Sequence, residues 1–298
     1  MKVHHLVDSS TLDQLADVKL HEDIIYNDPV TFHCYWNKEI ERNQLFSVLS
    51  CYLTNIKDTN NKIIIWQDFD LNTQINNPIY HILQRYCEIR YYDSSVEIIG
   101  TALENLKIES EYLKIPSFYS DYVRLSLLSK YGGVWFDLDM IFFRKLDYLF
   151  EKYDNFVTTW GRCDYPNGVP FWSRNKKVID NLIVKLIDNG GGHFGFQDSF
   201  STRGDGQKNF NLDSNQELNV LPCAWFDPMF LDFKDVSDLT KWFTNNNNEY
   251  FYDDAYCYHW HNRNHLPIEI GSPFHRNISK IIEDLNLQNE LNLQNEFI

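Results

Sequence analysis

The chain has 298 residues, a formal net charge of −15 and 43% hydrophobic residues. This hydrophobic content is enough for a substantial core, so it excludes a globally disordered chain. The acidic balance argues against nucleic acid as a partner, because a negative surface repels a phosphate backbone. Aromatic residues make up 16% of the chain, which suits stacking on sugars or bases as well as ordinary core packing.

The cysteines and the apolar segments bear on the compartment. Six cysteines, at 34, 51, 87, 163, 223 and 257, include no pair with the close spacing of a zinc or redox motif. Residues 1–10 lack the apolar stretch of a signal peptide, and no apolar run approaches membrane-spanning length. We therefore expect free thiols and a cytoplasmic protein with no membrane-spanning segment, while peripheral contact with a membrane stays open.

The first third of the chain alternates predicted strands and helices. Residues 1–29 are polar and weakly patterned, and we interpret them as an N-terminal extension. The elements predicted next are a strand at 31–36, a helix at 37–55, a strand at 62–67, a helix at 77–87 and a strand at 88–93. This alternation predicts the α/β class, with a largely parallel sheet covered by helices.

The centre of the chain predicts a helix that leads directly into a strand. Residues 117–133 have helical spacing, with Pro116 before them and two glycines at their end. Aromatic and apolar residues at 134–143 then favour a strand. The remaining predicted elements are strands at 155–160 and 168–174, a helix at 175–192, strands at 218–226 and 255–260, and a repetitive polar tail at 285–298.

Two aspartates interrupt the apolar run of the predicted strand 134–143. Side chains two apart on a strand point to the same face, so Asp137 and Asp139 would project together. Two carboxylates beside an apolar wall repel each other, and a divalent cation would relieve that repulsion. Their hard oxygen ligands suit Mg²⁺ or Mn²⁺. The alternative is an exposed edge strand with solvated aspartates.

The preceding helix adds an ion pair to this picture. Asp121 and Arg124 are three residues apart, so they share one helix face. The tight glycine connection would fold that helix back against the strand that carries the aspartates. A surface salt bridge is the simpler interpretation of the pair alone, but its combination with the D-x-D pattern favours a site.

Residues 120–140, SDYVRLSLLSKYGGVWFDLDM, resemble the signature of DXD-containing glycosyltransferases. These enzymes are of the initiating-mannosyltransferase, α-1,4-galactosyltransferase and capsular polysaccharide synthesis types, and are distantly like the clostridial glucosylating toxins. The resemblance implies a single GT-A domain over 1–298, with a Rossmann-like, mostly parallel central sheet, flanking helices and smaller acceptor-side additions. It also implies retaining, metal-dependent transfer of a hexose or N-acetylhexosamine. The donor would be a UDP- or GDP-sugar, with UDP preferred, and the acceptor a glycan, lipid or protein-linked hydroxyl.

The resemblance also implies roles for the motif residues. Asp139 would hold the metal, and Asp137 would reach the ribose or the metal through water. Asp121 and Arg124 would bind hydroxyls of the donor sugar. Together these four residues would position the donor and stabilise a cationic sugar and an anionic leaving group.

Further residues of the donor site come from weaker parts of the resemblance. Tyr131, in the Tyr-Gly-Gly part of the signature, falls on the donor-binding side. Trp36 would stack on the base, or it is a core tryptophan at a strand end. The glycine-rich stretch 189–200 departs from the family pattern, so Asp198 receives no role.

A late segment, YHWHNR at 258–263, resembles the family's His-Trp segment near the metal and diphosphate. His259, His261 or Asn262 would complete the metal shell, with both histidine rings on one strand face. The alternative is a pair of core or surface histidines.

Two other functional classes compete with this interpretation. A nucleotidyltransferase also uses D-x-D, but it usually has a Gly-Ser turn well upstream with a helix between, whereas here the helix precedes the glycines. A non-catalytic sugar- or nucleotide-binding module is the alternative without catalysis. The sequence does not identify the donor sugar, the base, the acceptor or the linkage, and it does not give the oligomeric state.

Overall fold

The computed structural model describes residues 2–5, 24–74, 76–104, 112–159, 166–188, 217–228, 236–244, 254–261 and 267–291. The strands are β1 Lys2–His5, β2 Thr31–Tyr35, β3 Lys62–Gln67, β4 Glu88–Tyr91, β5 Gly133–Trp135, β6 Met140–Phe142, β7 Asn155–Thr159, β8 Pro166–Ser173, β9 Glu217–Leu221 and β10 Cys257–His259. The α-helices are α2 Arg42–Cys51, α3 Pro78–Leu83, α4 Ser94–Glu97, α5 Pro116–Tyr131, α6 Asp147–Lys152, α7 Lys176–Asp188, α9 Val236–Thr244, α10 Pro273–Asp284 and α11 Gln288–Leu291. Short turns are the π-helical η1 Tyr52–Ile56 and the 3₁₀ turns η2 Leu71–Gln74, η3 Tyr112–Lys114 and η4 Cys223–Trp225.

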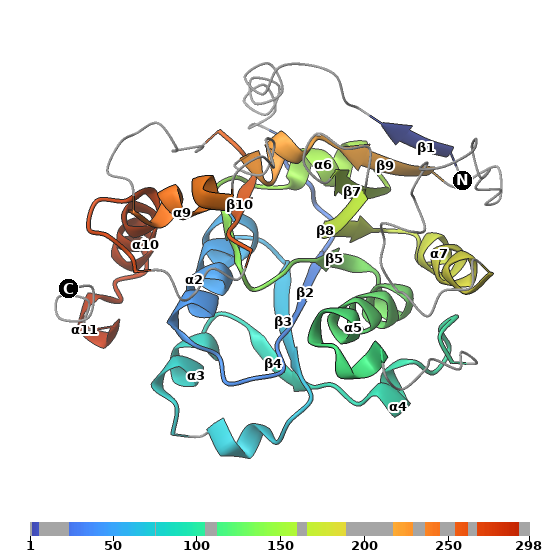
Figure 1. Ribbon diagram of the computed structural model, residues 1–298, viewed down its shortest axis with the longest axis horizontal. Helices are drawn as coiled ribbons and strands as arrows, with labels where there is room; N and C mark the ends of the chain where they lie inside the picture. The colour runs from blue at the N-terminus through green and yellow to red at the C-terminus, as the bar shows by residue number, and fades with distance from the viewer. Residues whose placement is uncertain are drawn as a thin grey trace.

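An eight-stranded sheet forms the centre, in the order β1-β9-β7-β8-β5-β2-β3-β4. Only β8 runs antiparallel to its neighbours, and the other pairs are parallel. Helices α2 and α3 lie on one side of the sheet, and α5 and α7 on the other (Figure 1). The predicted α/β class with a mostly parallel sheet is therefore confirmed. The sequence predicted no element within 1–29, yet β1 pairs with β9 at the sheet edge.

Burial on both faces explains why the central strands are continuous apolar runs. In β3, Ile63, Ile64, Ile65 and Trp66 are all buried, as expected for a parallel strand covered by helices on both sides.

The five cysteines among the described residues are free, while Cys163 lies outside them. No described helix is both long enough and apolar enough to cross a membrane.

Helix α5 ends at a glycine pair that turns the chain sharply into β5. Pro116 is the first residue of the helix rather than the residue before it. Gly132 and Gly133 have φ angles of 69° and 93°, a conformation that favours glycine. This turn places β5 beside β2 and leaves α5 packed over the sheet, which puts the middle of α5 close to the end of β5.

The predicted strand 134–143 is wrong, because the chain breaks into two strands at the D-x-D motif. Strand β5 ends at Trp135, and residues 138–139 form a turn before β6. Strand β6 pairs antiparallel with β10 in a separate two-stranded sheet. Asp137 and Asp139 therefore lie at the passage between two sheets, where the alternation of side chains along one strand does not apply.

Candidate active site

Asp139 is buried where the chain enters β6. Its side chain is 4% exposed, and its Oδ1 lies 2.9 Å from Nε2 of His259. The pairing of β6 with β10 sets this contact, because Met140 is in register with His259 and the Trp260 N–H donates to the Asp139 carbonyl at 2.9 Å. The structure thus brings the second aspartate of the motif and the late histidine segment together.

Asp137 lies at the rim of the same junction and contacts the ion pair of α5. Its side chain is 28% exposed, and its Oδ1 lies 3.4 Å from Nη2 of Arg124. The same guanidinium nitrogen is 3.2 Å from Oδ1 of Asp121. Arg124 is buried, so its charge is neutralised by two carboxylates rather than by solvent. Three of the residues predicted from the signature therefore form one connected group.

Trp135 is a site residue that the sequence analysis missed. It is fully buried, its Nε1 donates to Asp137 Oδ1 at 2.8 Å, and its ring lies 5.3 Å from the Arg124 guanidinium carbon. Its place at the end of β5, two residues before Asp137, was the available signal.

The two histidines of the late segment lie side by side. Strand β10 ends at His259, and His261 follows it with a φ angle of 50°. Their ring centroids are 4.0 Å apart, and His261 Nε2 lies 2.6 Å from Oδ2 of Asp227. Trp260 between them is buried against Phe274. Asp227 was also missed, because it is remote in sequence and no local pattern marks it.

Trp36 stands just beyond the carboxyl end of β2. It is half-buried, and its Nε1 donates to the carbonyl of Glu39 at 3.1 Å. Ligands of open α/β sheets bind at this edge. The position is compatible with base stacking, which the structure does not test.

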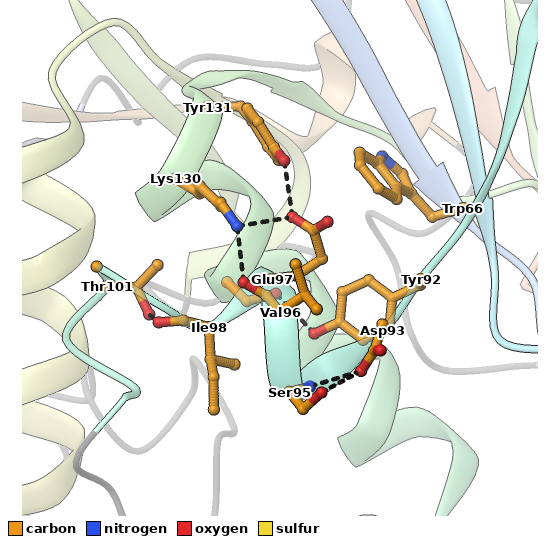
Figure 2. Close-up of polar contacts among 12 residues, drawn as sticks. Trp66, Tyr92, Asp93, Ser95, Val96, Glu97, Ile98, Thr101, Lys130 and Tyr131 are labelled. Atoms are coloured by element: carbon orange, nitrogen blue, oxygen red, sulfur yellow. Dashed lines mark hydrogen bonds and ion pairs between the residues drawn. The ribbon is translucent and has the colours of Figure 1, made fainter.

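Tyr131 lies at the opposite end of α5 from Asp121, and its contacts tie the helix to α4 and the sheet. Its hydroxyl donates to Glu97 Oε2 at 2.7 Å, and Glu97 also pairs with Lys130 at 3.2 Å (Figure 2). Its ring stacks on Trp66 at 5.8 Å and on His33 at 6.0 Å. These contacts do not bring Tyr131 into the carboxylate cluster.

Residues 22–156 match the family described as the glycosyltransferase sugar-binding region containing a DXD motif. This part of the chain, a little under half of its length, is similar to DXD glycosyltransferases. The match spans β2 to the first two residues of β7 and contains Asp121, Arg124, Asp137 and Asp139, whereas His259 and Asp227 lie beyond it. A comparison with curated protein sequences gives no significant match.

Several solved glycosyltransferases are similar to the chain in structure at low identity. The PaToxG glycosyltransferase is 13% identical with a TM-score of 0.42, over 63% of this chain and 74% of that one. The bifunctional glycosyltransferase WbbM is 12% identical with a TM-score of 0.48, over 91% of this chain and 51% of that one. Mouse xyloside xylosyltransferase 1 is 13% identical with a TM-score of 0.47, over 81% of this chain and all of that one. Similarity at this level does not identify a substrate for this chain.

The side chains at the junction fit a divalent cation, which DXD glycosyltransferases generally bind together with a nucleotide sugar. Asp137, Asp139 and His259 each offer a ligand atom, and these atoms lie within 4.8 Å of one another. Burial works against protonation of His259, but the carboxylates of Asp139, Asp227 and Asp137 outweigh it and raise its pKa to about 9. Without a metal, the imidazolium thus supplies positive charge that the surrounding carboxylates require. A metal ion ligated by His259 would take the place of that proton.

Asn262, the third polar residue of the predicted late segment, lies outside the described residues. The glycine-rich stretch 189–200 with Asp198, which received no role from the sequence, also lies outside them.

Proposed function

We propose that the protein is a metal-dependent glycosyltransferase that moves a hexose or N-acetylhexosamine from a nucleoside-diphosphate sugar to an acceptor hydroxyl. A UDP-sugar is our preferred donor, and the acceptor is a glycan, a lipid or a protein-linked sugar. The observation that carries the proposal is the convergence of Asp137, Asp139 and His259 within 4.8 Å, beside the buried Arg124.

The buried part of the cluster is suited to hold the cation. Asp139 and His259 would ligate Mn²⁺ or Mg²⁺, and the more exposed Asp137 would reach the donor ribose or a water on the ion. A cation held by these residues would supply Lewis-acid stabilisation of the negative charge on the leaving diphosphate. A local cation of this kind also lets a chain with a net charge of −15 bind an anionic donor.

Arg124 and Asp121 would orient the sugar of the donor. The guanidinium is fixed by Asp121, by Asp137 and by the ring of Trp135, so little freedom is lost when it binds hydroxyls. A group fixed before the substrate arrives favours reaction by holding the donor in one geometry.

We infer that transfer retains the configuration of the donor sugar. The resemblance of residues 120–140 implies retention, and Asp137 and Asp139 already contact Arg124 and His259 respectively. Carboxylates that are already paired in this way are poorly placed to act as nucleophiles. We therefore favour front-face attack by the acceptor hydroxyl, assisted by the departing phosphate. NMR of the anomeric centre of the product tests this, and a product of inverted configuration would refute it.

A screen of nucleotide sugars tests the function as a whole, because donor hydrolysis often proceeds without the acceptor. We expect release of nucleoside diphosphate from at least one donor in the presence of Mn²⁺. The release should stop in excess EDTA and in Asp139→Asn, whose melting temperature should stay near that of the wild type. Undiminished hydrolysis in EDTA, or release of pyrophosphate instead, would overturn the proposal.

A further inference from the structure

We propose that Asp227 is a ligand of the cation site, so that the metal centre extends beyond the D-x-D motif and His259. This inference rests on the proposed metal-dependent function. Asp227 lies outside residues 22–156, the stretch that matches the DXD family, so the family match gives it no role.

The backbone holds Asp227 rigidly beside the histidine segment. It follows η4, and its N–H donates to the Cys223 carbonyl at 2.7 Å. The Tyr256 N–H donates to the Trp225 carbonyl, also at 2.7 Å, which ties this turn to the chain entering β10. Two segments far apart in sequence are thereby fixed against each other, with Asp227 facing His261.

The carboxylate of Asp227 is buried and only half satisfied. The residue is 5% exposed, and its Oδ2 lies 2.6 Å from His261 Nε2. Its Oδ1 is buried and has no hydrogen-bond partner within the described ranges, and the same holds for Nδ1 of His259. Burying a carboxylate oxygen without a hydrogen-bond partner costs free energy, so such an atom requires an explanation. A cation ligated by this oxygen would offset that cost.

Asp227 also lies close to the cluster of Asp137, Asp139 and His259, which supports a role in binding the cation. Asp227, His259 and His261 offer ligand atoms within 4.8 Å of one another, and His259 belongs to this set as well as to the set with Asp137 and Asp139. The two sets therefore adjoin each other and share the imidazole of His259. Among the described residues, the carboxylates of Asp137, Asp139 and Asp227 therefore all lie near His259, and of these three Asp137 is the one that also pairs with Arg124.

The coordination number leaves room for the donor. Mg²⁺ and Mn²⁺ usually take more ligands than a protein site supplies, so an ion held by His259, Asp139 and Asp227 would still be able to accept oxygens of the donor. His261 would orient the Asp227 carboxylate through Oδ2, as residues that hold a metal ligand commonly do. Its φ of 50°, unusual for a residue other than glycine, turns the chain so that its ring lies over His259.

Mn²⁺ binding to the full chain tests the proposal directly, with the free ion followed by electron paramagnetic resonance. Asp227→Asn keeps the shape and removes the charge, and we expect Mn²⁺ affinity to fall at least about 10-fold. Asp254→Asn is the matched control, because it removes a carboxylate from the same neighbourhood that pairs with Arg144 instead. That control should leave Mn²⁺ affinity nearly unchanged. Melting temperatures of both variants confirm that they fold.

A comparison of His261→Ala with the double variant His261→Ala/Asp227→Asn tests whether Asp227 binds the ion or only orients His261. If Asp227 binds the ion, the double variant should bind Mn²⁺ more weakly than His261→Ala alone. Equal affinities of these two proteins would overturn the proposal, as would wild-type affinity in Asp227→Asn. Loss of Mn²⁺ binding in Asp139→Asn but not in Asp227→Asn would refute this inference and leave the proposed function standing. Failure of the wild type to bind Mn²⁺, alone or with UDP, would refute the proposed function itself.

Discussion

Trp135 positions Asp137 through a hydrogen bond of 2.8 Å from its indole Nε1 to the carboxylate Oδ1. The same indole ring lies 5.3 Å from the guanidinium carbon of Arg124, which in turn contacts Asp137 at 3.4 Å. Because Trp135 is fully buried, it holds a partly exposed carboxylate and a buried cation in a fixed relation to each other. The first aspartate of the motif is therefore oriented by a side chain that does not itself carry charge.

Replacing Trp135 by Phe should lower kcat/KM for donor hydrolysis while leaving the fold intact. Phe fills most of the volume but cannot donate to Asp137, and a hydrogen bond to a charged group contributes about 1.5–3 kcal/mol, or roughly 10–100-fold in rate. Trp172→Phe is the matched control, because its Nε1 donates to a backbone carbonyl, that of Tyr153, at 2.9 Å. Equal losses of kcat/KM in both variants would show a general packing effect instead.

Replacing Arg124 by Lys should impair turnover more than nucleotide binding. Lysine keeps the charge but lacks the planar fork that contacts Asp121 and Asp137 and can hold two sugar hydroxyls. We expect kcat to fall by at least about 10-fold, while the affinity for UDP by calorimetry changes little. Arg144→Lys, in the ion pair with Asp254, is the control for a generic arginine loss. If UDP affinity falls as far as kcat, Arg124 binds phosphate or supports the fold instead.

His33 gives the protein a pH-dependent stability unrelated to the site. Burial lowers its pKa from the ordinary 6.5 to about 3, and the charges of Arg90 and Lys62 act in the same direction. Its Nδ1 accepts from Trp66 Nε1 at 3.1 Å, which requires the neutral ring. Between pH 6.5 and 3 the unfolded chain binds a proton that the folded chain does not, so the free energy of unfolding falls as the pH falls.

We expect this residue to account for about 2 kcal/mol of lost stability between pH 7 and pH 5. His33→Gln keeps an acceptor for Trp66 but cannot titrate, so its unfolding free energy should change less over this range. Denaturant unfolding at the two pH values measures the difference between the proteins. An NMR titration that shows the His33 ring charged in the folded protein at pH 5 would contradict the argument.

The sequence predicted the sheet well because its central strands are buried on both faces. Ile63, Ile64 and Ile65 form such a run, and their strand was predicted with the observed bounds, 62–67. The D-x-D stretch was assigned to one strand because its residues are just as apolar. Composition cannot show that the chain changes sheets at Leu138, since this depends on pairing with β10, more than a hundred residues away.

The site was predictable only where its residues are close in sequence. Asp121, Arg124 and Asp137 lie in one short signature, and the structure joins them through a single guanidinium group. Asp227 carries no local pattern, and its proximity to His261 arises from tertiary contacts of the turn after β9. Contacts that close a long loop are set by the whole fold, so spacing along the chain does not reveal them.

Gly133 should be the least replaceable glycine in the connection that delivers the D-x-D motif. Its φ of 93° disfavours any side chain, and a Cβ there would be driven into the Thr31 carbonyl oxygen of β2. Gly100 is the matched control: its φ is 79°, but a Cβ there would meet nothing within 4 Å. Gly100→Ala should therefore show only the backbone strain, about 1–2 kcal/mol.

Gly133→Ala should lose more stability than this control, about 3–5 kcal/mol, because β2 and β5 must separate to admit the methyl group. Urea midpoints of the two variants measure the difference directly. Donor hydrolysis should also fall in Gly133→Ala below its unfolding temperature, because a shifted β5 moves Trp135 and with it Asp137. Similar urea midpoints for the two variants would mean that β2 yields easily, and the close approach of Gly133 to Thr31 would then not be what positions the motif.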